Sequence, residues 1–181
     1  MKYFLFFLVF TLVSLPAFAA EVDTDASVIT WTASKVTGSS HTGRIFPKKS
    51  QIQVVDGKIT GGKIVFDMTC FTVTDLSGKW ATKFLNHIKS SDFLHVDKFP
   101  TATIQINAVE RDRATGDLTV MGKTQRIVLS LKKGEGKWSG KATFDRTEFG
   151  MTYGSGNFFQ GLGDKAIEDL VHVSFDLVLK R

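Results

Sequence analysis

The 181-residue sequence contains one cysteine, three prolines and little net charge, and each scarcity excludes a class of protein. A single cysteine cannot form an intramolecular disulfide, so a disulfide-stapled scaffold is excluded, and we expect Cys70 to be a buried, inert thiol. Scarce proline and the lack of a Gly-x-y period exclude a collagen-like fibre. With 43% hydrophobic and 23% charged residues, the chain is too apolar for disorder, and one globular domain remains.

Only one long apolar run occurs, and it lies at the N-terminus. Lys2 precedes an apolar stretch over residues 4–15, and Ala17-Phe18-Ala19 provides the small-x-small pattern of a cleavage site. The stretch is shorter than the ~20 residues that a membrane-spanning helix needs, so we interpret residues 1–19 as a secretory signal peptide rather than an anchor. The mature chain is then a single domain over residues 20–181, located in the periplasm or otherwise secreted.

The mature chain has a small excess of positive charge. Removal of the signal peptide leaves 22 Lys and Arg against 18 Asp and Glu, a net charge of +4. Basic residues are distributed along the chain, as in Lys48-Lys49, Lys132-Lys133 and Lys180-Arg181. We interpret the excess as an aid to solubility, with a weak attraction to an anionic envelope surface, and it does not indicate nucleic-acid binding.

Alternation of apolar and polar residues, which is typical of half-buried β-strands, recurs along the mature chain. In the first such segment Ile29, Trp31 and Ala33 share one face, and polar residues occupy the other. Similar segments begin near Ile52, Ile64, Ile104, Leu118, Ile127, Trp138 and Val171. The turns expected between them are Asp56-Gly57, Gly61-Gly62, Ala114-Thr115-Gly116, Gly122-Lys123 and Gly134-Glu135-Gly136. This pattern predicts sequential antiparallel hairpins.

One segment, from Ser77 to about Ser90, breaks the alternation. Its apolar residues recur at helical spacing: Trp80, Phe84, Leu85 and Ile88. Asp75 or Ser77 is suited to cap the start of this short amphipathic helix. The connection that contains it, residues 73–99, is too long for an ordinary hairpin, which predicts a lid or a plug.

About eight strands joined in order, with one short helix in a long connection, predict an all-β fold, as a sandwich or a closed antiparallel barrel. Closure removes unpaired strand edges, which favours the eight-stranded barrel. Such a barrel is either filled by its own side chains or holds one slender ligand. Small residues share inward faces with large ones, as Ala33 does with Trp31 and Ala142 with Phe144. That pattern suits a hollow interior and a tapering solid core equally well.

Patterns of catalytic or metal-binding residues are weak. The four histidines, at positions 41, 87, 95 and 172, show no His-x3-His pairing, so no metal site is predicted. Gly154-Ser155-Gly156 invites comparison with a nucleophile loop, but Tyr153 and Asn157 stand where a nucleophile elbow needs glycine. We do not expect an enzyme. The enzymatic alternative would be an esterase-like activity that uses Ser155 or His87.

Five segments carry a resemblance to a known family. They are WTASKVTGSSHTG from Trp31, DMTCFTVTDL from Asp67, KSSDFLHVDKFPTATIQI from Lys89, GDLTVMGKTQRIVL from Gly116 and FDRTEFGMTYGSG from Phe144. In this order, over nearly the whole mature chain, they resemble the YceI family of secreted bacterial proteins. The resemblance implies a lipocalin-like antiparallel barrel with an elongated apolar channel that binds a polyisoprenoid or a similar amphiphile, without catalysis.

With this resemblance, we expect a periplasmic carrier that sequesters a polyisoprenoid, an isoprenoid quinone or a related lipid. No cofactor is expected apart from such a bound lipid. The alternative is a ligand-free envelope or stress-related protein with a solid core, which acts through structure or interaction. The sequence leaves the oligomeric state open, a homodimer included.

We expect a set of residues to line the channel, because they lie on the inward faces of the strands or in the connections at one end. They are Trp31, Ala33, Phe66, Met68, Trp80, Phe84, Phe93, Ile104, Ile106, Leu129, Trp138, Ala142, Phe144, Phe149 and Phe175. Four of them are expected to cover one end, although core packing would place them equally well: Trp80, Phe84, Phe93 and Phe149. Lys35 continues the inward parity of its strand, and with nearby His41 it is a candidate for meeting a polar head group. In the alternative, Lys35 extends to water.

Overall fold

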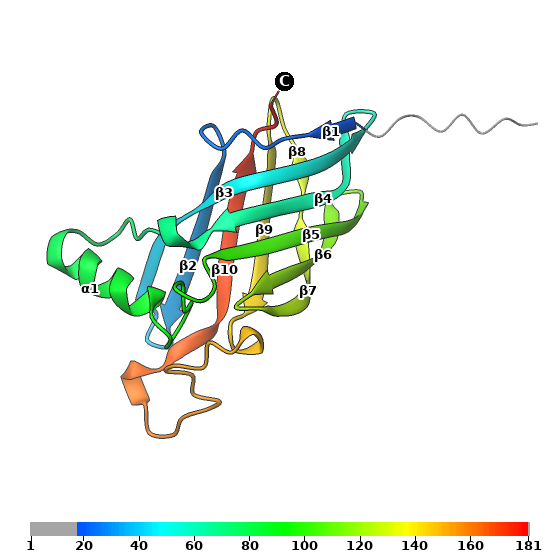
Figure 1. Ribbon diagram of the computed structural model, residues 1–181. Helices are drawn as coiled ribbons and strands as arrows, with labels where there is room; N and C mark the ends of the chain where they lie inside the picture. The colour runs from blue at the N-terminus through cyan, green and yellow to red at the C-terminus, as the bar shows by residue number, and fades with distance from the viewer. Residues whose placement is uncertain (1–17, 181) are drawn as a thin grey trace, which may run out of the picture.

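The computed structural model describes residues 18–180, in which the strands wrap into a closed sheet with a helix at one end (Figure 1). Most of the predicted signal peptide, residues 1–17, lies outside the described residues. The barrel strands are β2 (Val28–Lys35), β3 (Ser40–Val55), β4 (Lys58–Asp67), β5 (Thr101–Glu110), β6 (Arg113–Val120), β7 (Lys123–Ser130), β9 (Trp138–Asp145) and β10 (Ile167–Leu177). Two short strands, β1 (Phe18–Ala20) and β8 (Lys132–Lys133), pair with β3 and β9 respectively.

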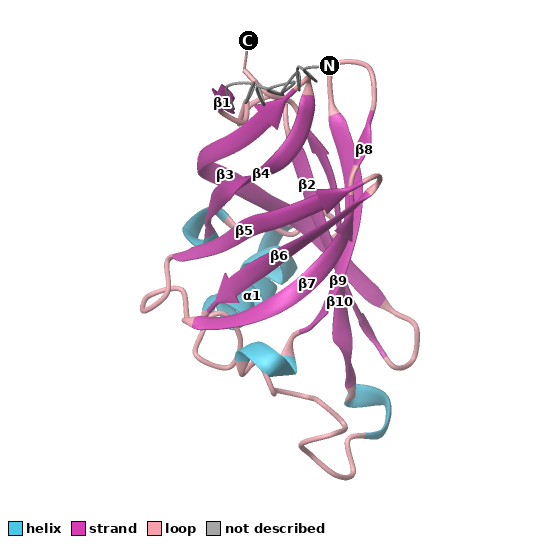
Figure 2. Cartoon of the chain, turned by 90° about the vertical axis from the view of Figure 1, so that its right-hand side faces the viewer, coloured by secondary structure: helices cyan, strands magenta, loops and turns pink. Residues whose placement is uncertain are grey.

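The barrel strands follow one another around the ring in chain order. Each pairs antiparallel with the next, and β10 pairs with β2 to close the sheet. Seen from the side, the strands cross obliquely as they wrap around the interior (Figure 2). The predicted all-β fold, a closed antiparallel eight-stranded lipocalin-like barrel with one short helix in a long connection, is confirmed.

Glycines mark the tight turns of the barrel but also lie inside its strands. Asp56 and Gly57 both adopt positive φ and join β3 to β4, as predicted. Gly61-Gly62 and Ala114-Thr115-Gly116, however, lie within β4 and β6, so these two predicted turns are wrong. A Cβ on Gly62 would lie 2.4 Å from the Gln51 carbonyl oxygen. Glycine there permits close approach of a neighbouring strand rather than chain reversal.

β3 is longer than its sequence suggests. Alternation indicated a strand only around Ile52, because Pro47 and Lys48-Lys49 interrupt the pattern upstream. The strand nevertheless runs through them, and its register with β4 shifts between Pro47 and Lys49. A bulge at that point accommodates a residue with no backbone donor.

The core closes the barrel at one end. Its most deeply buried apolar side chains there are Val22, Ile52, Ile59, Leu131 and Leu177. The Val22 N–H donates to Ser50 Oγ at 2.6 Å, and the Val178 N–H donates to Ser27 Oγ at 2.9 Å, so the segment before β2 is tied across this end. β1 lies at the same end in Figure 1, away from the helix.

The helix α1 (Gly78–Lys89) lies at the opposite end of the barrel, where the sequence predicted it (Figure 1). The predicted cap is wrong: Ser77 stands at the N-cap without a side-chain hydrogen bond, and Asp75 accepts instead from the backbone of Thr42. Three 3-10 helices, η1 (Met68–Cys70), η2 (Thr147–Phe149) and η3 (Gly163–Lys165), lie in connections.

Cys70 is exposed rather than buried, because η1 turns only Met68 toward the interior. In the described part of the chain, none of the helices combines the length and the apolar composition needed to cross a membrane.

Candidate functional site: an apolar cavity with a polar mouth

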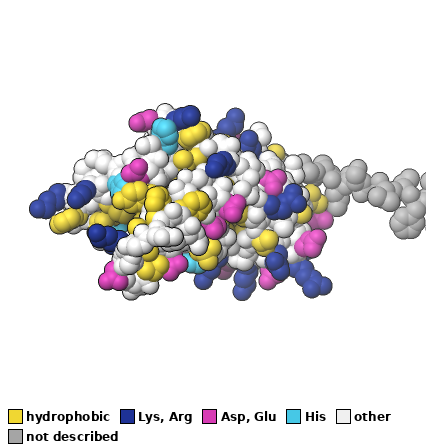
Figure 3. Space-filling model, turned by 90° about the horizontal axis from the view of Figure 1, so that it is seen from below, with side chains coloured by type: hydrophobic (Ala, Val, Ile, Leu, Met, Phe, Trp, Pro, Cys, Tyr) yellow, Lys and Arg dark blue, Asp and Glu magenta, His cyan; other side chains and the backbone are white. Residues whose placement is uncertain are grey.

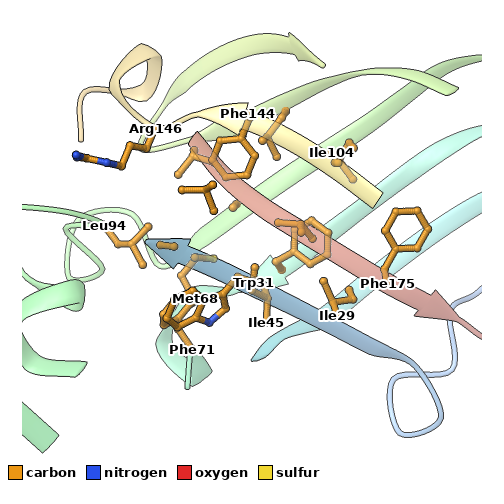
Figure 4. Close-up of a pocket in the computed structure, with 18 of the residues that line it drawn as sticks. Ile29, Trp31, Ile45, Met68, Phe71, Leu94, Ile104, Phe144, Arg146 and Phe175 are labelled. Carbon is orange, nitrogen blue, oxygen red and sulfur yellow. The ribbon is translucent and has the colours of Figure 1, made fainter. Parts of the chain in front are cut away.

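The inward faces of all eight barrel strands enclose a cavity of about 370 Å³. Thirty of its 36 lining residues are apolar. In Figure 4, Ile29, Ile104, Phe144 and Phe175 project from different strands into this space. The six polar lining residues belong to the end beside α1: Ser34, Lys35, Ser39, His41, His87 and Arg146. The cavity is therefore apolar along its length and polar at its mouth.

Trp31 organises one side of the mouth. Its ring stacks with Phe71 at 4.8 Å between centroids (Figure 4) and lies parallel to Phe84 of α1 at 6.1 Å. The indole N–H also donates to the Thr72 carbonyl oxygen at 3.0 Å. A Cβ on Gly43 would lie 1.8 Å from that oxygen, so only glycine lets the chain pass so close. Trp31 thus holds both the segment after β4 and the helix against the barrel.

His41 stands beside this stack and is held by a carboxylate. His41 Nδ1 lies 2.7 Å from Asp75 Oδ2, and the Thr42 N–H donates to Asp75 Oδ1 at 2.9 Å. Burial acts to raise the pKa of Asp75, but the hydrogen bonds from Thr42 and His41 outweigh it and lower the pKa. The ionised carboxylate therefore fixes the His41 ring, which lies 4.6 Å from the ring of Phe84.

A second aromatic group forms the other side of the mouth. The His87 ring meets Phe93 and Tyr153 edge-on, at 5.1 Å and 4.7 Å between centroids. Asp92 Oδ2 lies 3.1 Å from His87 Nε2. Because His87 belongs to α1 and Tyr153 to the β9–β10 loop, this contact joins the helix to the loop.

Arg146 anchors the β9–β10 loop from inside the protein. Its side chain is 2% exposed, and Arg146 Nη2 forms an ion pair with Asp169 Oδ1 at 3.2 Å. The guanidinium also donates to four carbonyl oxygens, those of Met151, Tyr153, Ile167 and Glu168. Burial lowers its pKa, while the charges of Asp169 and Asp145 oppose that shift. These bonds fold the loop around one buried cation.

Ser155 belongs to the same network. It is completely buried, and its Oγ donates to Asp169 Oδ2 at 2.9 Å. Asn157 Nδ2 donates to the same carboxylate oxygen at 2.8 Å. Because the buried Ser155 hydroxyl donates its hydrogen bond to Asp169, it stabilises the structure of this loop. Among residues 18–180, no three His, Cys, Asp or Glu side chains gather as a metal-ligand set.

The structure places most of the nominated residues on the cavity wall. The lining includes Trp31, Ala33, Phe66, Met68, Phe84, Phe93, Ile104, Ile106, Leu129, Ala142, Phe144 and Phe175, together with Lys35 and His41 at the mouth. Three nominated residues, Trp80, Trp138 and Phe149, do not line it.

The three residues outside the lining have distinct positions. Trp80 is 62% exposed, because the first turn of α1 extends past the barrel wall (Figure 1). Trp138 pairs with Leu177 near the closed end, beneath the ammonium of Lys133. Phe149 is buried behind the wall and packs edge-on against Phe144, at 5.5 Å between centroids.

Sequence reasoning missed two residues of the mouth. Arg146 continues the inward parity of Ala142 and Phe144, so alternation carried the signal that would have found it. Phe71 follows η1 outside any strand, and no periodic pattern marks it. Its position depends on the stack with Trp31, which lies 40 residues away in the chain.

Fold and cavity together define the class of lipocalin-like antiparallel barrels with an apolar interior. A sequence profile described as the YceI-like domain matches residues 21–179. The chain therefore belongs to the YceI-like family.

Curated relatives agree with this assignment. Protein YceI of Shigella flexneri is 39% identical over 62 residues, which is 30% of this chain and 32% of that protein. A UPF0312 protein of Ectopseudomonas mendocina is 43% identical over 70 residues, 34% of this chain and 37% of that protein. The chain thus spans about a third of the length of these curated relatives.

Two crystal structures share the fold at low sequence identity. BcnA of Burkholderia cenocepacia matches with a TM-score of 0.63 and 17% identity, covering 88% of this chain and 99% of that one. A polyisoprenoid binding domain from Saccharophagus degradans, implicated in plant cell wall breakdown, matches with a TM-score of 0.62 and 13% identity, covering 90% and 98%. At these identities the similarity concerns the fold.

Proposed function

We propose that the protein is a periplasmic carrier that sequesters a long apolar amphiphile in its barrel. A polyisoprenoid, an isoprenoid quinone or a related lipid fits this description. In this proposal the secretory signal peptide, residues 1–19, is removed on export. The apolar cavity of about 370 Å³ is the observation that carries the proposal. The polyisoprenoid-binding description of the Saccharophagus degradans domain, which has the same fold, supports it.

Binding of the tail follows from burial alone. At ~0.8 kcal/mol per buried CH₂, a tail of several isoprene units gains enough free energy without any directed polar contact. Selectivity among tails of similar width is then low, since the wall offers hydrophobic side chains almost throughout. The cavity favours this function over a ligand-free protein with a solid core, and no catalytic step is part of the proposal.

In this proposal the polar head group of the ligand binds at the side of the mouth that contains Lys35 and His41. The Arg146 N–H groups are taken up by carbonyl oxygens and by Asp169, so Arg146 has a structural role. Lys35 is exposed at the mouth, and His41 is held beside it by Asp75. An ammonium and an imidazole at this position suit a phosphate or a quinone oxygen.

Tryptophan fluorescence tests the carrier function, because Trp31 alone among the three tryptophans lines the cavity. In a variant carrying Trp80→Phe and Trp138→Phe, titration with geranylgeraniol should change the emission of Trp31 in a saturable way. In the matched variant carrying Trp31→Phe and Trp138→Phe, the exposed Trp80 should not respond. Equal responses from both variants, or none from either, would contradict binding in the cavity.

A further inference from the structure

We propose that the mouth end of the barrel docks on an anionic lipid bilayer. The docking surface consists of three segments around the cavity mouth: the β2–β3 connection with the adjoining strand ends (residues 35–40), α1, and residues 150–166 of the β9–β10 loop. We call these three segments the mouth rim. Their exposed apolar side chains, their mutual contacts and their charge each support this assignment.

Exposed apolar side chains are concentrated on the mouth rim. Of the eight large hydrophobic residues exposed in the described part of the chain, five belong to it: Val36 (52% exposed), Trp80 (62%), Tyr153 (45%), Phe158 (57%) and Phe159 (49%). The remaining three, Val28, Val128 and Leu170, belong to barrel strands. Gathered exposed apolar side chains mark an interaction surface, and tryptophan and tyrosine are favoured at the boundary between lipid and water.

The three segments form one continuous surface. The Val36 N–H donates to the Ala166 carbonyl oxygen at 3.1 Å, which joins the β2–β3 connection to the β9–β10 loop. The rings of His87 and Tyr153, 4.7 Å apart, join that loop to α1. Figure 3 shows the molecule from below the view of Figure 1, with hydrophobic side chains exposed among those of Lys, Arg, Asp and Glu.

The net charge of the mature chain also belongs to the mouth rim. The rim carries one acidic residue, Asp164, and five basic ones: Lys35, Lys79, Lys83, Lys89 and Lys165. Without the rim and Lys2, the chain has 17 basic and 17 acidic residues and is neutral. The excess charge therefore lies on the mouth rim, which Asp75, Asp92 and Glu148 border. Lysines around exposed aromatic residues complement an anionic bilayer.

Docking in this orientation brings the cavity mouth against the lipid. A lipid tail then passes from bilayer to cavity without crossing water. This use of the surface in loading rests on the proposed carrier function. The docking itself rests only on the exposed side chains and the charge of the mouth rim.

Vesicle sedimentation tests the docking. The protein is purified from the compartment to which cells export it, and its mass is checked for removal of residues 1–19. It is then mixed with vesicles of pure phosphatidylcholine or of phosphatidylcholine with about 30% phosphatidylglycerol. We expect at least about fivefold stronger binding to the anionic vesicles, and a loss of that advantage between about 0.1 and about 0.5 M salt.

Two variants separate the apolar contribution from the charge. The triple change Trp80→Ser, Phe158→Ser and Phe159→Ser should weaken binding to anionic vesicles at least about tenfold, since it removes large exposed apolar side chains that do not line the cavity. The pair Lys79→Gln and Lys83→Gln, both exposed on α1, should weaken the same binding by roughly tenfold and leave any binding to pure phosphatidylcholine unchanged.

The barrel wall supplies matched controls. Val128→Ser removes an exposed apolar side chain of β7, and the pair Lys49→Gln and Lys63→Gln removes exposed lysines of β3 and β4. These variants should bind anionic vesicles within about twofold of the unchanged protein. Wall variants as impaired as the rim variants, or an unchanged protein that binds neither kind of vesicle, would overturn the docking surface.

Titration of the triple variant with geranylgeraniol, without vesicles, keeps the two proposals separate. Cavity filling in that variant is followed by co-elution of radiolabelled geranylgeraniol and should equal that of the unchanged protein. Normal filling together with failed sedimentation of the unchanged protein would overturn docking alone. Failed filling together with normal sedimentation would overturn the carrier function alone.

Discussion

Replacement of Arg146 by alanine should lower the free energy of unfolding by about 3 to 5 kcal/mol, the usual cost of removing one partner of a buried ion pair. Arg146 is 2% exposed, and its removal leaves the largely buried carboxylate of Asp169 without its cation. The four carbonyl oxygens that it binds also lose their donors. Urea denaturation followed by circular dichroism measures this effect.

An exposed arginine provides the matched control. Arg126 pairs with Asp117 at 3.4 Å, but its side chain is 73% exposed, so Arg126→Ala should cost no more than about 1 kcal/mol. Arg146→Ala should also make the β9–β10 loop sensitive to proteolysis, because this loop is folded around the guanidinium. Equal stability losses in the two alanine variants would show that the buried network does not hold the fold.

Replacement of Ala142 by tryptophan should abolish most lipid binding while the barrel stays folded. Ala142 lines the cavity from β9, opposite Leu129 of β7 and Val173 of β10. An indole there displaces several methylene groups of a bound tail, and at ~0.8 kcal/mol each this weakens affinity at least about tenfold. Co-elution of radiolabelled geranylgeraniol with the protein measures the loss.

The neighbouring residue on the same strand controls for the added bulk. Thr143 is exposed on the outer face of β9, so Thr143→Trp adds the same side chain outside the cavity. It should leave lipid binding unchanged. Because overpacking costs about 1 to 3 kcal/mol, thermal unfolding of both variants is measured first. A folded Ala142→Trp protein with undiminished affinity would place the ligand elsewhere.

Alternation in the sequence predicted the strands and much of the inward-facing wall, and the need to close unpaired strand edges favoured the barrel over a sandwich. Ala142 and Phe144 face the cavity because they share a parity, and the same rule places Trp31 and Ala33. The helix around Phe84 was likewise predicted, since a change of period from two to 3.6 residues is visible in the sequence alone. These features depend on residues within one strand or helix.

Features that depend on distant contacts were not predicted. The β9–β10 loop folds around Arg146 through carbonyl oxygens, which no side-chain pattern reveals. Gly62 resembles a turn residue, yet it serves the close approach of two strands. Trp80 has helical spacing with Phe84, but the length of α1 relative to the barrel decides that Phe84 reaches the cavity and Trp80 does not.

The grouping of charge has the same origin. Lysines that are scattered in the sequence come together because three separate connections end at one side of the barrel. Lys35 and Lys165 are 130 residues apart in the chain, yet each belongs to a segment that borders the cavity mouth. Topology, rather than local composition, therefore creates the mouth rim.

The most direct measurement is the amount of apolar molecule carried by the protein as cells make it. Protein purified from its exported compartment without detergent is extracted with organic solvent, and the extract is quantified by mass spectrometry against the protein. We predict a single isoprenoid or other long apolar molecule per chain, as suits the interior of an eight-stranded barrel. Repeated preparations that release no apolar species, and that take up none when geranylgeraniol is offered, would contradict the carrier function.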